Sequence, residues 1–218
     1  LLNRGKRFIF RKRIEERVKK KEMIIITNPS AVKDEIGSIN SLFEEGLSLL
    51  HIRKPNFSEF EMAQYVHQIK LEFRSKLVLH SHHQLADDFG INRIHFCERE
   101  RKTIRVNNVE SKIISTATHS IKDLNSLSSD YEYAFLSPVY ASISKENYFP
   151  KTNLLEDIKQ RTNFDSKMVA LGGIHSGNIE VTLQNGFDNI ALLGTIWNND
   201  HPTKQFKLCQ QIVHSYLV

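Results

Sequence analysis

The sequence predicts one compact (β/α)8 barrel, an α/β fold of eight parallel strands that alternate with helices. Eight short apolar runs recur along the chain, most of them rich in Ile, Val and Leu, as expected of strands buried on both faces. Helix-like segments fit the intervals between these runs, which is the order found in parallel-sheet proteins. An open doubly wound sheet is the main alternative, but eight regular units fit a closed barrel better.

The apolar runs and the periodic segments give the expected elements in order. The predicted strands cover residues 24–27, 47–52, 76–80, 93–96, 112–116, 133–139, 168–171 and 189–193. The predicted helices cover residues 34–45, 58–74, 121–126, 154–161, 177–184 and 203–216. Ser58 and Glu61 have the spacing of a capping box at the start of the second helix. The intervals after the third, fourth and fifth strands are short, so the helices there must be abbreviated.

The segment 167–197 combines a strand, a glycine break, a helix and a second strand that ends at Gly194. Glycines just after parallel strands let backbone N–H groups approach a ligand closely. In (β/α)8 barrels the loops after the seventh and eighth strands commonly hold a phosphate. Gly172, Gly173 and Gly194 are therefore candidate phosphate-binding residues, although the Gly172-Gly173 pair could simply turn the chain.

The positive charge of the chain is confined to its first residues. The formal net charge is +5, yet residues 1–22 carry ten Lys or Arg and three Glu, so the rest of the chain is slightly acidic. We expect Met23 to be the natural initiator, residues 1–22 to be a leader outside the fold, and residues 23–218 to form the barrel. A basic arm that binds RNA or an acidic surface is the rival interpretation. The globular part gives no indication of nucleic-acid binding.

Composition limits the cellular setting. No apolar run approaches the length of a membrane span, and no signal-peptide pattern is visible. The two cysteines, Cys97 and Cys209, lack the spacing of a disulfide framework or a metal site. We therefore expect a cytoplasmic protein with reduced thiols and no membrane partner. The sequence leaves a homo-oligomer open.

The predicted carboxyl ends of the strands, where barrel enzymes place their active residues, are cationic and rich in hydroxyl groups and glycine. That chemistry suits a phosphorylated anion. Arg53 presents a planar fork of donors and Lys54 adds a point charge, while His51 precedes them. Ser142, Ser144 and Lys145 offer two hydroxyls and an ammonium group. Ordinary solvated polar loops are the alternative in each case.

Histidines at these strand ends suggest two kinds of chemistry. His119 follows the fifth strand, where an imidazole can move protons near neutral pH or merely cap the next helix. His80 and His82 would point the same way on an extended segment and could share a zinc ion. Only His51 and His95 are plausible suppliers of further ligands. Polar loop histidines are the ordinary alternative for the cluster at residues 80–83.

Together these segments resemble the thiamine-phosphate synthase/TenI family of (β/α)8 barrels, from Met23 to about Trp197. The matching segments are HIRK at 51–54, RIHF at 93–96, the tail of TATHS at 116–120, SPVYASISK at 137–145 and ALGGI at 170–174. The resemblance implies a small phosphorylated thiazole substrate, and a pyrimidine substrate as well if the protein is a synthase. It implies that Ser142, Ser144, Lys145 and Gly173 bind phosphate and that Arg53 orients substrate.

The departures from the family bear on which reaction it catalyses. A synthase joins hydroxymethylpyrimidine pyrophosphate to hydroxyethylthiazole phosphate with Mg²⁺, which the family holds with an Asn-Asp pair and a further Asp. His80-Ser81 stands in place of that pair, and Pro55 in place of a lysine, with Lys54 as an imperfect substitute. Glu98, Glu100 and Asp87 are weak candidates for relocated magnesium ligands, since Mg²⁺ takes hard oxygen ligands.

Three hypotheses follow from the resemblance. The preferred one is a TenI-like thiazole tautomerase that needs no cofactor, in which His119 transfers the proton. The second is a thiamine-phosphate synthase that uses Mg²⁺ through relocated ligands. The third is a non-catalytic barrel that binds a phosphorylated metabolite.

Overall fold

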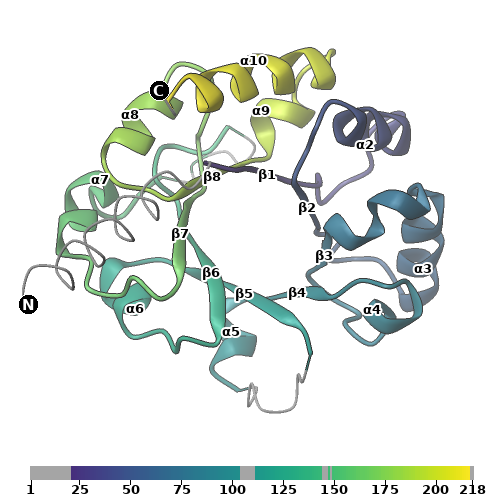
Figure 1. Ribbon diagram of the computed structural model, residues 1–218, viewed down its shortest axis with the longest axis horizontal. Coiled ribbons are helices and arrows are strands. Elements are labelled where there is room, and N and C mark those ends of the chain that lie inside the picture. The colour runs from purple at the N-terminus through teal and green to yellow at the C-terminus, as the bar shows by residue number, and fades with distance from the viewer. Residues whose placement is uncertain (1–20, 104–110, 144–146, 148, 217–218) are drawn as a thin grey trace, which may run out of the picture.

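Eight parallel strands close into a barrel in the computed structural model, which describes residues 21–103, 111–143, 147 and 149–216. The strands are β1 Met23–Ile26, β2 Leu49–Ile52, β3 Leu77–Leu79, β4 Arg93–Phe96, β5 Ile113–Thr118, β6 Tyr131–Leu136, β7 Lys167–Ala170 and β8 Asn189–Leu192. They follow one another in chain order, and Ile24 of β1 pairs with Leu49 on one side and Ala191 on the other (Figure 1). The predicted (β/α)8 barrel is confirmed, and each predicted strand overlaps an observed one.

Helices surround the ring of strands (Figure 1). They are α2 Glu35–Glu44, α3 Glu59–Gln68, η1 Leu71–Lys76, α4 Leu85–Asp88, α5 Glu98–Arg101, α6 Ile121–Asn125, α7 Leu154–Asp157, η3 Ile158–Gln160, α8 Ile179–Gln184, α9 Gly194–Trp197 and α10 Pro202–Ser215. As predicted, the helices α4, α5 and α6 are only four or five residues long. None of the helices in the described part of the chain is both long and apolar enough to cross a membrane.

The helix predicted at 58–74 differs from the observed structure at its centre. Its start is confirmed, because the Ser58 backbone N–H donates to Glu61 and the Glu61 backbone N–H donates to the Ser58 hydroxyl, which completes the capping box. The helix ends at Gln68, because the backbone of the next residue, the buried Ile69, is extended, and the 3-10 helix η1 follows. The short helix α9 was not predicted.

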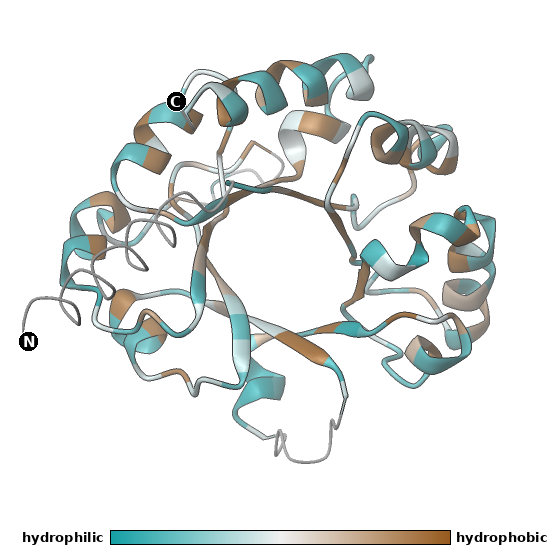
Figure 2. Ribbon diagram, viewed as in Figure 1, coloured by the Kyte–Doolittle hydropathy of each residue, from teal (hydrophilic) through white to brown (hydrophobic). Residues whose placement is uncertain are grey.

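The strands separate two apolar layers because their side chains alternate between the inside and the outside of the barrel. Ile24 and Ile26 belong to the inner layer with Val78, whereas Met23 and Ile25 pack in the outer layer between strands and helices. Figure 2 shows helices that carry both hydrophilic and hydrophobic residues around strands with long apolar stretches. This arrangement fixes which residues of a strand can reach the interior.

The residues assigned to the basic leader lie largely outside the described residues, which begin at Lys21. Two of them contact the barrel. The Lys21 ammonium donates to the Phe187 carbonyl at 3.0 Å, and the Glu22 backbone N–H donates to the Asn189 side chain at 2.9 Å. The Ile190 backbone N–H in turn donates to the Glu22 carbonyl at 3.2 Å. The hydrogen bonding of the barrel therefore begins at least two residues before Met23.

Candidate active site

A cavity of about 280 Å³ opens at the carboxyl ends of the strands. Its described lining includes Arg53, His80, His95, Cys97, His119, Ser137, Ser142, Gly172, Gly173, Gly194 and Thr195, with apolar side chains between them. The structure thus brings together six of the predicted site residues, namely Arg53, His119, Ser142, Gly172, Gly173 and Gly194. Ser144 and Lys145 lie outside the described residues.

Gly172 and Gly173 allow the loop after β6 to pack against the loop after β7. Both have a positive φ, 99° and 66°. The Tyr140 backbone N–H donates to the Gly172 carbonyl at 3.0 Å. A Cβ on Gly173 would lie 2.2 Å from the Ala141 carbonyl oxygen, so no larger residue fits unless that loop moves. The pair therefore turns the chain and at the same time shapes the wall of the cavity.

His119 directly follows β5 and is held by the backbone of the loop after β6. Its Nδ1 lies 2.7 Å from the Ser137 carbonyl oxygen. A carbonyl only accepts hydrogen bonds, so Nδ1 carries the proton and the neutral ring has its lone pair on Nε2. The Nε2 atom lies 3.8 Å from a carboxylate oxygen of Glu98. The alternative role as a cap of the next helix is not observed, because Ser120 caps α6.

Neighbouring residues of the HIRK segment face opposite sides of the barrel wall. Arg53 lines the cavity. Lys54 is 1% exposed and its ammonium donates to Glu35 at 2.6 Å and to the Asn28 carbonyl at 2.7 Å. It also lies 5.2 Å from the centre of the Tyr65 ring. The assignment of Lys54 to the substrate-binding residues is corrected accordingly: this ammonium is part of a buried ion pair behind the wall.

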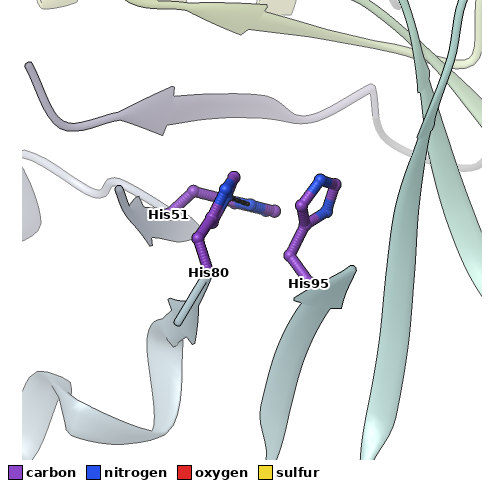
Figure 3. Close-up of side chains that lie close together, drawn as sticks. All are labelled: His51, His80 and His95. Carbon is purple, nitrogen blue, oxygen red and sulfur yellow. Dashed lines mark hydrogen bonds between the residues drawn. The ribbon is translucent and has the colours of Figure 1, made fainter. Parts of the chain in front are cut away.

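Three imidazoles gather inside the barrel at the base of the cavity, of which two are buried and that of His80 is partly buried. His51 Nδ1 lies 2.8 Å from His80 Nε2, and the rings of His80 and His95 stack with centroids 4.2 Å apart. Figure 3 shows the three side chains converging from β2, from the end of β3 and from β4. His51 also lies 2.7 Å from the Tyr133 hydroxyl. His51 is thus below the cavity, whereas His80 and His95 form part of its wall.

Burial controls the protonation of this cluster. Desolvation lowers the pKa of His51 and of His80 well below the ordinary value, and the neighbouring imidazoles lower both further. Desolvation also lowers the pKa of His95, to about 3. The charged guanidinium of Arg53 contributes to the lowering at His80 and His95. All three rings are therefore neutral at neutral pH.

The other two histidines of the 80–83 cluster do not join this group. His82 has a positive φ of 53°, so the segment is not extended there, and its Nε2 lies 2.8 Å from the Phe57 carbonyl. The expectation that His80 and His82 point the same way is therefore wrong. His83 packs edge-on against Phe96.

Among the described residues, the three acidic residues suggested as magnesium ligands do not form a group that could hold a metal ion. Glu98 pairs with Lys102 at 2.5 Å, and this hydrogen bond is the main cause that lowers the pKa of Glu98. Glu100 accepts from the Cys97 backbone N–H. Asp87 is 80% exposed and pairs with Lys112. No Asp or Glu is found among the described residues that line the cavity.

Sequence reasoning did not single out Tyr133 and Ser115, which support the histidine cluster. Tyr133 contacts His51, and the Ser115 hydroxyl lies 2.9 Å from His95 Nδ1. The alternation of side chains along a strand could have predicted the position of Tyr133. It lies two residues before Phe135, so both side chains point to the interior of the barrel. Polar groups at interior positions are uncommon and mark a specific environment.

Comparison with known proteins identifies the family. The sequence model described as thiamine monophosphate synthase matches residues 23–196, which is most of the chain. The chain belongs to the thiamine monophosphate synthase family. The resemblance deduced from the five segments is confirmed.

Members of this family recur among the relatives. A thiamine-phosphate synthase of Caldicellulosiruptor saccharolyticus is 21% identical over 190 residues, covering 84% of this chain and 86% of its own. The crystal structure of thiamine phosphate pyrophosphorylase from Bacteroides thetaiotaomicron has a TM-score of 0.72 at 26% identity and covers 88% of this chain and 96% of its own. Thiamine phosphate pyrophosphorylase from Pyrococcus furiosus has a TM-score of 0.76 at 17% identity, with 92% and 99% coverage, a likeness of fold.

Proposed function

We propose that this protein is an enzyme of thiamine biosynthesis that binds a phosphorylated thiazole in the cavity at the carboxyl ends of its strands. Family membership supports the pathway, and the glycine-lined wall formed by Gly172, Gly173 and Gly194 supports the phosphate end of the substrate. The Arg53 guanidinium in the same cavity can pair with a carboxylate or phosphate oxygen.

The geometry of His119 favours proton transfer on the thiazole, the reaction of a tautomerase. Its Nδ1–H is fixed on the Ser137 carbonyl, so Nε2 is the only ring atom that can accept a proton. In the proposed reaction Nε2 removes a proton from a ring carbon of the non-aromatic thiazole, and the bonding electrons shift toward the exocyclic carbon. The same imidazolium then returns the proton to that carbon. One proton changes place, and no oxidant or reductant is needed.

Glu98 stabilises the imidazolium that forms during this transfer. Its carboxylate oxygen lies 3.8 Å from His119 Nε2, but both side chains are partly exposed, so solvent screens the attraction. The cavity also contains apolar side chains, which limit the access of water to the carbanion-like intermediate. These residues supply binding, a base and its counter-charge.

Thiamine-phosphate synthesis is the second candidate, because the relatives carry that name. That reaction needs a pyrimidine pyrophosphate and Mg²⁺, which binds to hard oxygen ligands. The described cavity residues offer hydroxyls and carbonyls but no carboxylate. The cation would therefore rely largely on the pyrophosphate oxygens and water in this chain. The geometry fits the tautomerase better.

One assay separates the candidates. The purified protein is incubated with the non-aromatic thiazole carboxylate phosphate, and its conversion to the aromatic tautomer is followed by NMR with and without a chelator. A parallel reaction contains hydroxymethylpyrimidine pyrophosphate, hydroxyethylthiazole phosphate and Mg²⁺. Conversion that survives the chelator supports the tautomerase, whereas Mg²⁺-dependent thiamine phosphate would assign the protein to the synthases. Absence of both reactions in folded protein would leave a barrel that only binds a phosphorylated metabolite.

A further inference from the structure

The three interior histidines have the arrangement of a metal site. We propose that His51, His80 and His95 bind one divalent transition-metal ion, of which Zn²⁺ is the first candidate, with an open coordination position toward the cavity. Binding of such an ion by the protein does not depend on which reaction the protein catalyses.

The positions of the ligands come from the barrel itself. His51 lies on β2, His80 directly after β3 and His95 on β4, so three adjacent strands each deliver one imidazole to the interior. Each ring offers a nitrogen, and these three nitrogens all lie within 4.8 Å of one another. Among the described residues, no other group of His, Cys, Asp and Glu comes together in this way. Ligands on strands are held more rigidly than ligands on loops.

Two of the rings are oriented by hydrogen bonds on the nitrogen that faces away. The Ser115 hydroxyl donates to the Ile94 carbonyl at 3.3 Å, so its oxygen accepts from His95 Nδ1–H at 2.9 Å and leaves the lone pair of Nε2 free. His51 Nε2 lies 2.7 Å from the Tyr133 hydroxyl, which leaves Nδ1 for a metal ion. Metal-binding histidines almost always have such a partner on the second nitrogen.

The chemistry of the ligands selects the class of metal. Three imidazoles suit Zn²⁺, Co²⁺, Ni²⁺ or Cu²⁺, whereas Mg²⁺ and Ca²⁺ prefer oxygen ligands. Three protein ligands with a fourth open position are typical of catalytic rather than structural zinc sites.

The surroundings indicate where a fourth ligand would bind. His80 and His95 line the cavity, so the open position faces a bound small molecule or water. The Arg53 guanidinium lines the same cavity and opposes a bare dication, which makes an anionic fourth ligand favourable. Such a ligand could be hydroxide or an oxygen of a phosphorylated substrate.

A metal-free hydrogen-bonded cluster is the competing interpretation. His51 Nδ1 and His80 Nε2 are 2.8 Å apart and share one proton in that state. Two nitrogens on one tetrahedral Zn²⁺ stand roughly 3.3 Å apart, given bonds of about 2.0–2.1 Å, so this pair must separate slightly. The three nitrogens lie within 4.8 Å of one another, so metal binding also requires the wider pairs to approach through rotation of the side chains.

The test measures metal binding directly. The full chain, purified without a polyhistidine tag and stripped with a chelator, is titrated with Zn²⁺ in a calorimeter, and Co²⁺ binding is followed by its visible absorption. Variants H80Q and H95Q remove one ligand each, and S115A removes a hydrogen-bond partner. Variant H82Q is the matched control, because His82 belongs to the same segment but contacts the Phe57 carbonyl. Circular dichroism establishes that each variant is folded.

We expect one equivalent of Zn²⁺ and the absorption of tetrahedral Co²⁺ in wild type and in H82Q. H80Q and H95Q should weaken Zn²⁺ binding by about 100-fold or more, and S115A by about 10–100-fold. Folded wild type that binds no stoichiometric Zn²⁺ would overturn the proposal, and so would Zn²⁺ binding that H80Q and H95Q leave unchanged. Loss of binding in H82Q equal to that in H80Q would also overturn it, because the ions would then bind at the surface.

Discussion

The imidazole of His119 is anchored to the carbonyl oxygen of Ser137, 2.7 Å from Nδ1, across the neighbouring strands β5 and β6. This contact decides which nitrogen can act as a base. It also ties the position of the base to the loop that begins at Ser137 and carries Ser142 into the same cavity. In the proposed reaction, one short segment therefore links binding of the phosphate end to placement of the base.

Replacement of His119 by Gln should abolish proton transfer while leaving substrate binding nearly intact. General acid–base catalysis by one positioned side chain contributes about 10²–10⁴-fold, so kcat for tautomer conversion should fall by that factor with little change in KM. NMR of the two tautomers gives both constants. H67Q is the matched control, because His67 is exposed on α3. An unchanged kcat in H119Q would remove His119 from the mechanism.

Gly173→Ala should destabilise the protein by more than the cost of placing alanine at a positive φ, because the new Cβ would also clash with the cavity wall. Gly173 and Gly90 have nearly the same φ, 66° and 67°, but a Cβ on Gly90 meets nothing within 4 Å. G90A should therefore show only the cost of a left-handed residue, about 1–2 kcal/mol of unfolding free energy. G173A should lose more stability, because the Cβ would lie 2.2 Å from the Ala141 carbonyl oxygen.

Activity distinguishes the two glycines further. Displacement of the loop after β6 by G173A should lower kcat/KM by about 10²-fold, since misplacement of binding groups by about 1 Å has that effect. G90A, which lies outside the described cavity lining, should leave kcat/KM unchanged. Urea unfolding and steady-state kinetics check the two expectations. Equal losses in both variants would mean that the contact with Ala141 has no role.

The fold could be predicted from the sequence because burial on both faces leaves an unmistakable pattern. Most strands are short apolar runs, as in LVL at 77–79 and MIII at 23–26, and eight such runs admit few topologies. The short helix α9 leaves no comparable pattern, since four residues starting with Gly194 show no helical periodicity. The interruption at Ile69 escaped prediction because a single buried apolar residue also fits the apolar face of a continuous helix.

The site could be predicted only where the barrel fixes the direction of a side chain. The places of His119 and Gly173 in the cavity lining could be predicted because His119 directly follows β5 and Gly173 lies in the loop just after β7. Lys54 was misassigned because adjacent residues at a strand end face opposite sides, so Arg53 lines the cavity while Lys54 packs behind it. The direction of His82 depends on a positive φ, which nothing in the residue sequence around it indicates.

Breaking the buried ion pair of Lys54 should unfold the barrel readily. Lys54→Met leaves the Glu35 carboxylate buried without its partner. Removal of one partner of a buried ion pair typically lowers the free energy of unfolding by about 3–5 kcal/mol. The exposed pair Lys70–Glu44 is the matched control, and K70M should leave the unfolding free energy nearly unchanged, because solvent screens this pair.

The double variant K54M/E35L tests the cause of this instability. It removes the isolated carboxylate along with the ammonium and should recover much of the stability lost in K54M, because apolar residues can replace a buried pair at little cost. Urea unfolding of the variants gives the free energies. A double variant as unstable as K54M would show that the packing of Lys54 matters, and that the unpaired charge of Glu35 does not.

The buried histidines should make the barrel sensitive to mild acid in the presence of a chelator, which removes any metal contribution. Burial lowers the pKa of His51, His80 and His95 in the folded protein. In the unfolded chain imidazoles bind protons below about pH 6.5, so the unfolded state binds more protons than the folded state. The stabilisation is fully present above about pH 6.5 and is lost as the pH falls, down to about 3 for His95.

The slope of the free energy of unfolding against pH gives the number of histidines involved. Each one should contribute about 1.4 kcal/mol per pH unit below its unfolded pKa, and the interval from pH 6 to pH 5 precedes most carboxylate titration. Urea unfolding at several pH values measures the slope. H95Q should reduce it by about one proton, whereas H67Q, which changes an exposed residue of α3, should keep the slope of the wild type. A wild-type free energy of unfolding that stays constant over this interval would contradict neutral buried imidazoles.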